Sequence, residues 1–267
     1  MKMVRANKLL SRIRSDWWYN SSMRKRKRPT ASATIGCCGW GEAQARYFEH
    51  FAAIELQAPF YQMPSASLAA KWRAAAPAGF QFYLKAWQLI THTPASPTYR
   101  RLKEPVSASE RELFGSFRPT EQVWLAWERT QEIARVLEAA VILFQCPASF
   151  DPAPHHVRNL RAFFSQIERG SARLAWEPRG HWPDPLVREL CVEFDLLHCV
   201  DPFKARSVYG DPLYWRLHGR NGYRYTYTDA DLTELRNQIT EAQSPGIVLF
   251  NNYTMRDNAL RFQAMLA

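Results

Sequence analysis

The sequence predicts a single (β/α)₈ barrel of the TIM type, and three observations favour it. Eight apolar or aromatic runs resemble strands, and most are separated by helical stretches between residues 33 and 267. About 250 residues is typical of such barrels. The run at 141–145 is apolar without alternation, which suits a parallel sheet covered on both faces. The rival, a doubly wound sheet, usually carries a glycine-rich phosphate loop, and no GxGxxG or Walker pattern occurs here.

The first half of the chain contains four of the eight expected strands. Helix formers and aromatic residues follow the first strand, Pro77 and Gly79 end the second helix, and Thr120 is expected to cap the third. The expected strands are 34–40, 53–57, 80–86 and 141–145, and the expected helices are 42–50, 67–75 and 121–138.

A long irregular stretch, residues 87–120, follows the third strand. It contains prolines, which resist helix formation, and the cations Arg100, Arg101 and Lys103. Loops of this length in compact domains are usually functional or disordered. Because it leaves the carboxyl end of a strand, we expect it to cover the pocket. The alternative is a surface excursion packed on the outer helices.

The second half repeats the same alternation of strand and helix. Either Thr228 or Asp229 is expected to cap the helix that follows the seventh strand. The expected strands are 173–177, 196–201, 213–217 and 246–250, and the expected helices are 154–168, 184–194, 229–242 and 255–266.

The formal net charge of +10 belongs almost entirely to the first thirty residues. Residues 1–30 contain ten basic side chains and one acidic side chain, so residues 31–267 are nearly neutral. Such a basic tail can contact nucleic acid or an anionic membrane through phosphate groups, and it also resembles a transit peptide. We favour a dispensable leader, disordered and removable, with Met23 as a possible true start. The barrel domain is then residues 31–267.

Cysteine usage and hydropathy suggest a cytoplasmic protein. No run approaches the roughly 18 apolar residues that a membrane span requires. The five cysteines are an odd number without zinc-site spacing, and no secretory signal is visible. We therefore expect reduced thiols.

Polar residues follow nearly every predicted strand, at the end where TIM-type barrels carry their working face. Unpaired charges in a core cost on the order of several kcal/mol each, so these residues must pair, bind a ligand or face water. The candidate catalytic residues are Lys85, Glu177, Asp201 and His218, and the candidate substrate-binding residues are Glu55, Tyr61, Gln145, Arg179, Arg216, Arg220, Asn251 and Asn252.

Each candidate also has a structural alternative. Glu55 and Lys85 fall on neighbouring strands, so they are equally well explained as an internal ion pair. Asn251 and Asn252 are equally suited to satisfying loop backbone groups, and a single aromatic such as Tyr61 is more often a packing residue. Glu177 precedes a proline that holds it extended, which favours a functional carboxylate there.

Several motifs resemble the DUF72 (YecE-like) family, in the same order, from about residue 33 to the end. The motifs are IGCCGW at 35–40, FY at 60–61, KA at 85–86, LITH at 89–92, FQCPASF at 144–150, EPR at 177–179, RLHGR at 216–220 and FNN at 250–252. The resemblance implies a TIM-type barrel with a polar pocket at the strand carboxyl ends. The chain looks like the short subgroup, since it lacks the aromatic insertion that longer members carry after their first strand. The resemblance supplies no reaction and no cofactor.

Three functions remain open from the sequence. The leading hypothesis is an enzyme acting on a small anionic ligand, phosphorylated or carboxylated, that Arg179, Arg216 and Arg220 would bind. Glu177 and Asp201 would share acid–base duty, and Lys85 would neutralise charge or act as an amine base.

The second hypothesis is a metal-dependent phosphodiesterase or nuclease, with the basic tail holding nucleic acid. Neighbouring arginines compete for the same carboxylates, and no HxH or HExxH spacing occurs, so we assign no metal site. The third is a ligand-binding or scaffold barrel without catalysis, in which the charged ring satisfies itself.

Overall fold

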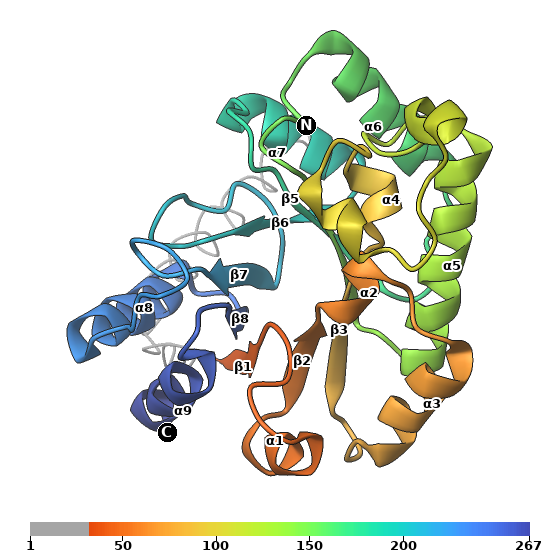
Figure 1. The fold of residues 1–267 in the computed structure, drawn as a ribbon. Coiled ribbons are helices and arrows are strands. Elements are labelled where there is room, and N and C mark those ends of the chain that lie inside the picture. The colour runs from red at the N-terminus through yellow and green to blue at the C-terminus, as the bar shows by residue number, and fades with distance from the viewer. Residues whose placement is uncertain (1–31) are drawn as a thin grey trace, which may run out of the picture. The chain divides into compact units, whose positions relative to one another are not determined.

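Eight parallel strands close into a barrel in sequence order in the part of the chain that the structure, a computed structural model, describes, residues 32–267. Each strand pairs with the next, and the eighth returns to pair with the first. In Figure 1 the strands form an inner ring, and most of the helices lie outside it. The predicted TIM-type (β/α)₈ barrel is confirmed. The basic tail at 1–30 lies outside the described residues.

The strands are short, and their boundaries agree closely with the sequence pattern. They are β1 (Ala33–Cys37), β2 (Ala53–Leu56), β3 (Gln81–Lys85), β4 (Val141–Gln145), β5 (Arg173–Glu177), β6 (Leu196–Val200), β7 (Leu213–Leu217) and β8 (Gly246–Phe250). The first strand ends earlier than predicted, because Gly39 turns the chain at a φ of +108°.

The helices confirm most of the prediction and add short elements that it missed. The structure contains α1 (Gln44–His50), α2 (Ala58–Tyr61), α3 (Ala66–Ala75), α4 (Gln88–Thr91), α5 (Glu121–Leu137), α6 (Pro154–Gln166), α7 (Asp184–Glu193), α8 (Asp229–Ala242) and α9 (Met255–Leu266), with 3₁₀ helices η1 (Pro97–Arg101) and η2 (Ala108–Leu113). None of the helices between residues 32 and 267 is long and apolar enough to cross a membrane.

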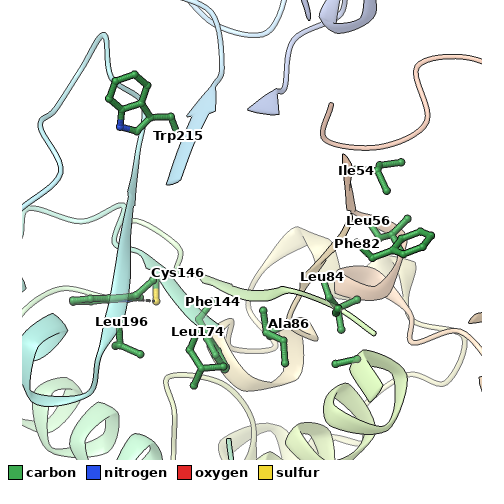
Figure 2. Close-up of a cluster of buried hydrophobic side chains, with 14 of the residues drawn as sticks. Ile54, Leu56, Phe82, Leu84, Ala86, Phe144, Cys146, Leu174, Leu196 and Trp215 are labelled. Carbon is green, nitrogen blue, oxygen red and sulfur yellow. Dashed lines mark hydrogen bonds between the residues drawn. The ribbon is translucent and has the colours of Figure 1, made fainter. Parts of the chain in front are cut away.

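The two faces of the strands carry different side chains, since successive residues point to opposite faces. One buried cluster, including Ala53, Tyr83 and Leu249, fills the barrel interior. A larger cluster lies between the strands and the helices. Figure 2 shows part of that outer layer, with Ile54 and Leu56 of β2 beside side chains of β3. Alternation therefore decides which residues reach the interior.

Two predicted helix caps had different outcomes. Thr228 caps α8 through a capping box, in which its hydroxyl accepts a hydrogen bond from the Asp231 amide and the Asp231 carboxylate accepts from the Thr228 amide. Thr120 is the N-cap residue of α5, as predicted, but its side chain makes no capping hydrogen bond. Its hydroxyl instead donates to the carbonyl of Leu113, in the segment before α5.

The segment at 87–120 is more ordered than an irregular loop, since α4, η1 and η2 all lie within it. Its end docks on α4: the amides of Gly115 and Phe117 donate to the carbonyls of Leu89 and Ile90, at 2.8 and 2.9 Å. Gly115 has a φ of +78°, and a Cβ there would lie 2.2 Å from the His92 carbonyl oxygen. Only glycine fits this close approach.

We therefore expect Gly115→Ala to lower the free energy of unfolding by about 3 kcal/mol or more. Gly79 is a matched control, because its φ is +79° and a Cβ there would meet nothing within 4 Å. Gly79→Ala should cost about 1 kcal/mol, which is the conformational penalty alone. Urea denaturation of both variants measures the difference. Equal losses would mean that the segment is not held against α4.

Candidate functional site

The predicted polar residues gather at one end of the barrel because of strand alternation. Glu55, Lys85 and Glu177 each lie two positions after an interior residue, namely Ala53, Tyr83 and Ala175. The same spacing applies on β4, β6, β7 and β8 to Gln145, Asp201, Arg216 and Asn251. All of them therefore point toward the barrel axis at the carboxyl ends of the strands.

Arg216 lies at the centre of this group and is fully buried. Its Nη2 donates to Glu55 Oε1 at 2.9 Å, and its Nη1 donates to Glu177 Oε2 and to Gln145 Oε1. The Tyr214 hydroxyl donates to Glu55 Oε2 at 2.7 Å. The predicted alternative of an ion pair between Glu55 and Lys85 was wrong, because Arg216 occupies the carboxylate. Arg216 lies beneath the site as its internal counter-ion.

Glu177 is held as a carboxylate by its neighbours. Burial acts to raise its pKa, but the positive charges of Arg216 and Arg179 outweigh burial and hold the pKa at about 2. Arg179 Nε lies 3.1 Å from Glu177 Oε1. Glu177 therefore has no proton to donate at neutral pH, and its role as a general acid stays a prediction without support from its surroundings.

His218 is held on both sides of its ring. Arg179 Nη2 lies 3.0 Å from His218 Nε2, and since a guanidinium can only donate, Nε2 must accept. The Nδ1 then carries the proton and lies 3.5 Å from Asp201 Oδ2. Asp201 Oδ2 also accepts from the His218 backbone amide at 3.1 Å. Asp201 thus positions a histidine whose Nε2 is the basic atom.

Lys85 is buried without a carboxylate partner. Its Nζ lies 3.6 Å from the centre of the Phe60 ring, and it has no salt bridge with any residue of the described barrel. Burial, reinforced by the positive charge of Arg216, lowers its pKa from 10.5 to about 7. A lysine with such a pKa can exchange a proton at physiological pH.

A cavity of about 660 Å³ opens beside Lys85, and we call it the cationic cavity. Lys85, Arg101 and Arg179 line it, and no aspartate or glutamate does. Its lining consists of Gln57, Ala58, Phe60, Tyr61, Lys85, His92, Thr98, Arg101, Gln145, Pro147, Ala148, Arg179, Tyr223 and Asn251. Arg101 lies over the Tyr61 ring, 3.6 Å from its centre. The segment at 87–120 therefore supplies part of the wall of this cavity.

A second cavity of about 540 Å³ lies over β5, β6 and β7, and we call it the histidine cavity. His198 and His218 line it together with acidic side chains. Ala148, Arg179 and Tyr223 line both cavities, so the two adjoin around Arg179. The lining includes Glu177, Asp184 and Asp201 as acids and Arg179 and Lys204 as cations.

Two predicted binding residues lie elsewhere. Arg220 lines neither of these two cavities: its Nε donates to Asp231 Oδ1 at 2.5 Å, and its guanidinium lies over the Phe203 ring. Asn252 donates to the Tyr225 carbonyl at 2.7 Å and so holds a loop. Arg220 was predicted to bind a ligand because its loop follows β7. In the structure it pairs instead with acidic side chains of α8.

Some contributors to the site were missed. Tyr214 was not chosen, although it lies two residues before Arg216 on the same face of β7. His92 was seen only as part of a motif; burial lowers its pKa to about 3, so it is a neutral wall of the cationic cavity. Lys204 comes from the loop after β6, whose path the sequence pattern does not indicate.

The arrangement of the acidic side chains bears on whether the site suits a metal ion. Within residues 32–267, no group of three or more His, Cys, Asp or Glu side chains is arranged to hold a metal ion. Glu55 and Glu177 are both paired with Arg216. A guanidinium between two carboxylates excludes a cation from the same position by charge and by volume.

Comparisons with known proteins give the family of this chain and the same barrel fold. The family model described as "Protein of unknown function DUF72" matches residues 34–267. UPF0759 protein YunF of Bacillus subtilis (strain 168) is 25% identical over 277 residues, covering 87% of this chain and 93% of its own. The crystal structure of a DUF72 family protein from Enterococcus faecalis V583 has a TM-score of 0.67 at 19% identity, covering 88% of this chain and 97% of that one.

A more distant fold likeness also occurs. The crystal structure of AP endonuclease, family 2, from Brucella melitensis has a TM-score of 0.50 at 10% identity, and the match covers 88% of this chain and 96% of that chain. At this identity the likeness concerns the barrel fold alone.

Proposed function

The chain belongs to the DUF72 family, and we propose that it binds a small anionic ligand, phosphate- or carboxylate-bearing, in the cationic cavity at the mouth of its barrel. The observation that carries the proposal is the charge of that cavity. Three cations line it and no carboxylate does. Its volume of about 660 Å³ lies within the range of small-molecule sites.

The three cations of the cavity differ in how many contacts they already make with the protein. The Lys85 ammonium group lies over the Phe60 ring and forms no salt bridge within residues 32–267, and Arg101 lies over the Tyr61 ring. Arg179 has one nitrogen on Glu177 and one on His218, and a third of its side chain is exposed. Planar guanidinium groups suit phosphate and carboxylate oxygens, and an ammonium adds a compact charge.

Lys85 makes ligand binding depend on pH. Its pKa of about 7 means that its ammonium group loses its charge as the pH rises through the neutral range. A bound anion favours the protonated form, so binding raises that pKa and takes up a proton. His92, with a pKa of about 3, stays neutral over this range. Affinity must therefore fall as the pH rises above 7.

The test uses sulfate, whose charge is constant between pH 5 and 9. We expect its affinity, measured by calorimetry at low ionic strength, to fall about tenfold or more between pH 6 and pH 9. Lys85→Arg keeps the charge at every pH and should bind sulfate with a flat profile. Absence of sulfate binding at pH 6 would refute the proposal, and equal affinity at both pH values would remove Lys85 from the site.

A further inference from the structure

We propose that the ligand has two unlike ends: an anionic end in the cationic cavity and an uncharged, hydroxyl-bearing end in the histidine cavity, where His218 Nε2 accepts a hydrogen bond from the hydroxyl. This inference rests on the proposed function, because it requires the anion to bind as described above. It adds a second subsite, a substrate class and a role for His218. A phosphate or a carboxylate serves equally as the anionic end.

The first step of the argument is that the two cavities adjoin. Ala148, Arg179 and Tyr223 line both of them, so one ligand can occupy both around the Arg179 side chain. Each cavity has a volume suited to a small molecule, about 660 and 540 Å³. An ion as small as sulfate leaves the histidine cavity empty.

The second step is that the cavities differ in charge. The cationic cavity has three cations and no carboxylate. The histidine cavity has the carboxylates of Glu177, Asp184 and Asp201 against two cations, Arg179 and Lys204. A second anionic group there would meet unfavourable charge, whereas a hydroxyl group can donate to an acceptor. The pair of cavities thus selects ligands with a single anionic end.

The third step concerns the acceptor. His218 lines the histidine cavity; its Nε2 accepts from Arg179 Nη2 at 3.0 Å, and its Nδ1 lies 3.5 Å from Asp201 Oδ2. Arg216 Nη1 and Glu177 Oε1 also face Nε2, at 3.5 and 3.7 Å, and the Tyr223 ring lies edge-on to the imidazole. An anion in the cationic cavity offers Arg179 another acceptor, and His218 Nε2 is then free for the hydroxyl.

The contact is a hydrogen bond, and no covalent bond breaks: the ligand O–H donates to the lone pair of His218 Nε2. The Asp201 carboxylate lies 3.5 Å from Nδ1 and favours the tautomer that carries its proton there. Nε2 therefore stays the acceptor.

The test compares two probes of equal length and charge, glycerol 3-phosphate and propyl phosphate, which differ only in the hydroxyl groups. We expect glycerol 3-phosphate to bind at least about tenfold more tightly to the wild-type protein, the effect of one or two hydrogen bonds. In His218→Leu the ratio of the two affinities should fall to about one, because the loss of the partner of Arg179 affects both phosphates alike. Asp201→Asn, which removes the charge that positions His218, should reduce the ratio without abolishing it.

Each outcome separates the two proposals. If neither probe binds, the proposed function fails and this inference fails with it. If both bind with equal affinity to the wild-type protein, the inference is wrong and the anion site stands. Should His218→Leu fail to fold, nitrogen NMR of the His218 ring in the wild-type protein provides the answer. Its Nε2 signal must shift with glycerol 3-phosphate and differ from that with propyl phosphate, and identical signals overturn the inference.

Discussion

Replacing Arg216 by methionine is expected to lower the free energy of unfolding by about 3–5 kcal/mol at pH 7. Arg216 is 0% exposed, and its guanidinium is the shared partner of two buried carboxylates, Glu55 and Glu177. Methionine fills a similar volume but leaves both carboxylates without their counter-ion. Removing one member of a buried ionic group is costly because the remaining charges stay desolvated.

The loss of unfolding free energy in Arg216→Met should be smaller at acidic pH, and the titration of Glu177 gives the direction of this change. Its pKa is lowered to about 2 in the folded wild-type protein, so its stabilising contribution is present above pH 4.5 and disappears as the pH falls toward 2. In the variant, unpaired carboxylates take up protons more readily, and denaturation at pH 4.5 should therefore show a smaller difference from wild type than at pH 7.

Two further proteins control this experiment. Arg129→Met removes an exposed arginine that pairs with Glu132 one turn along α5, and it should change stability by about 0.5 kcal/mol or less. Adding Glu55→Gln and Glu177→Gln to the Arg216 variant removes the unpaired charges and should recover part of the loss. An Arg216→Met protein as stable as wild type at pH 7 would contradict the account of a charged network.

The barrel and the gathering of polar residues could be predicted because both depend on local spacing. Strands such as Val141–Gln145 have no polar face, which indicates cover on both sides. Side chains two residues apart share a face, so Glu177 had to follow Ala175 into the interior. Parallel strands in sequence order then bring their carboxyl ends to one rim. None of this needs knowledge of tertiary contacts.

The pairing of charges could not be predicted, because it depends on distances across the barrel. Glu55 and Lys85 lie on neighbouring strands, yet the partner of Glu55 is Arg216, 161 residues later in the chain. Arg220 was assigned to the ligand by its position near His218, but Asp231 and Glu234 on α8 hold it. Sequence spacing predicts which face of a strand a charged residue lies on. It does not predict which residue of opposite charge lies nearest to it in the folded barrel.

The same limit applies to local signals that tertiary structure overrides. Thr120 has the residue type and position of a helix cap, but the segment before α5 offers the Leu113 carbonyl as an acceptor. Thr228 behaves as predicted because its partner, Asp231, lies within the same helix. Local rules therefore succeeded where both partners are close in sequence.

Replacing Lys85 by methionine is expected to weaken sulfate binding about tenfold or more at pH 6 and, at the same time, to stabilise the fold by about 1–3 kcal/mol. Lys85 is 4% exposed, and no carboxylate of the described barrel pairs with it. Folding must therefore desolvate its ammonium group without a compensating ion pair. Methionine keeps most of the apolar stem and removes the charge.

The pH dependence gives the sharper test. The pKa of Lys85 falls from 10.5 to about 7 on folding, so the unfolded chain binds more protons between these values and wild-type stability rises with pH across that window. The advantage of Lys85→Met should be full below pH 7 and fade toward pH 10.5. Guanidinium denaturation at pH 6, 8 and 10 measures it, with Lys71→Met on the exposed face of α3 as the matched control.

The two effects of this substitution must occur together. A lysine kept in the barrel at a cost to stability, beside a cavity without carboxylates, is explained if an anion completes its environment. If Lys85→Met is more stable at pH 6 and still binds sulfate as wild type does, Lys85 is no part of the anion site. If it is less stable than wild type at pH 6, the ammonium group has a partner in the folded protein, and folding does not lower the pKa of Lys85.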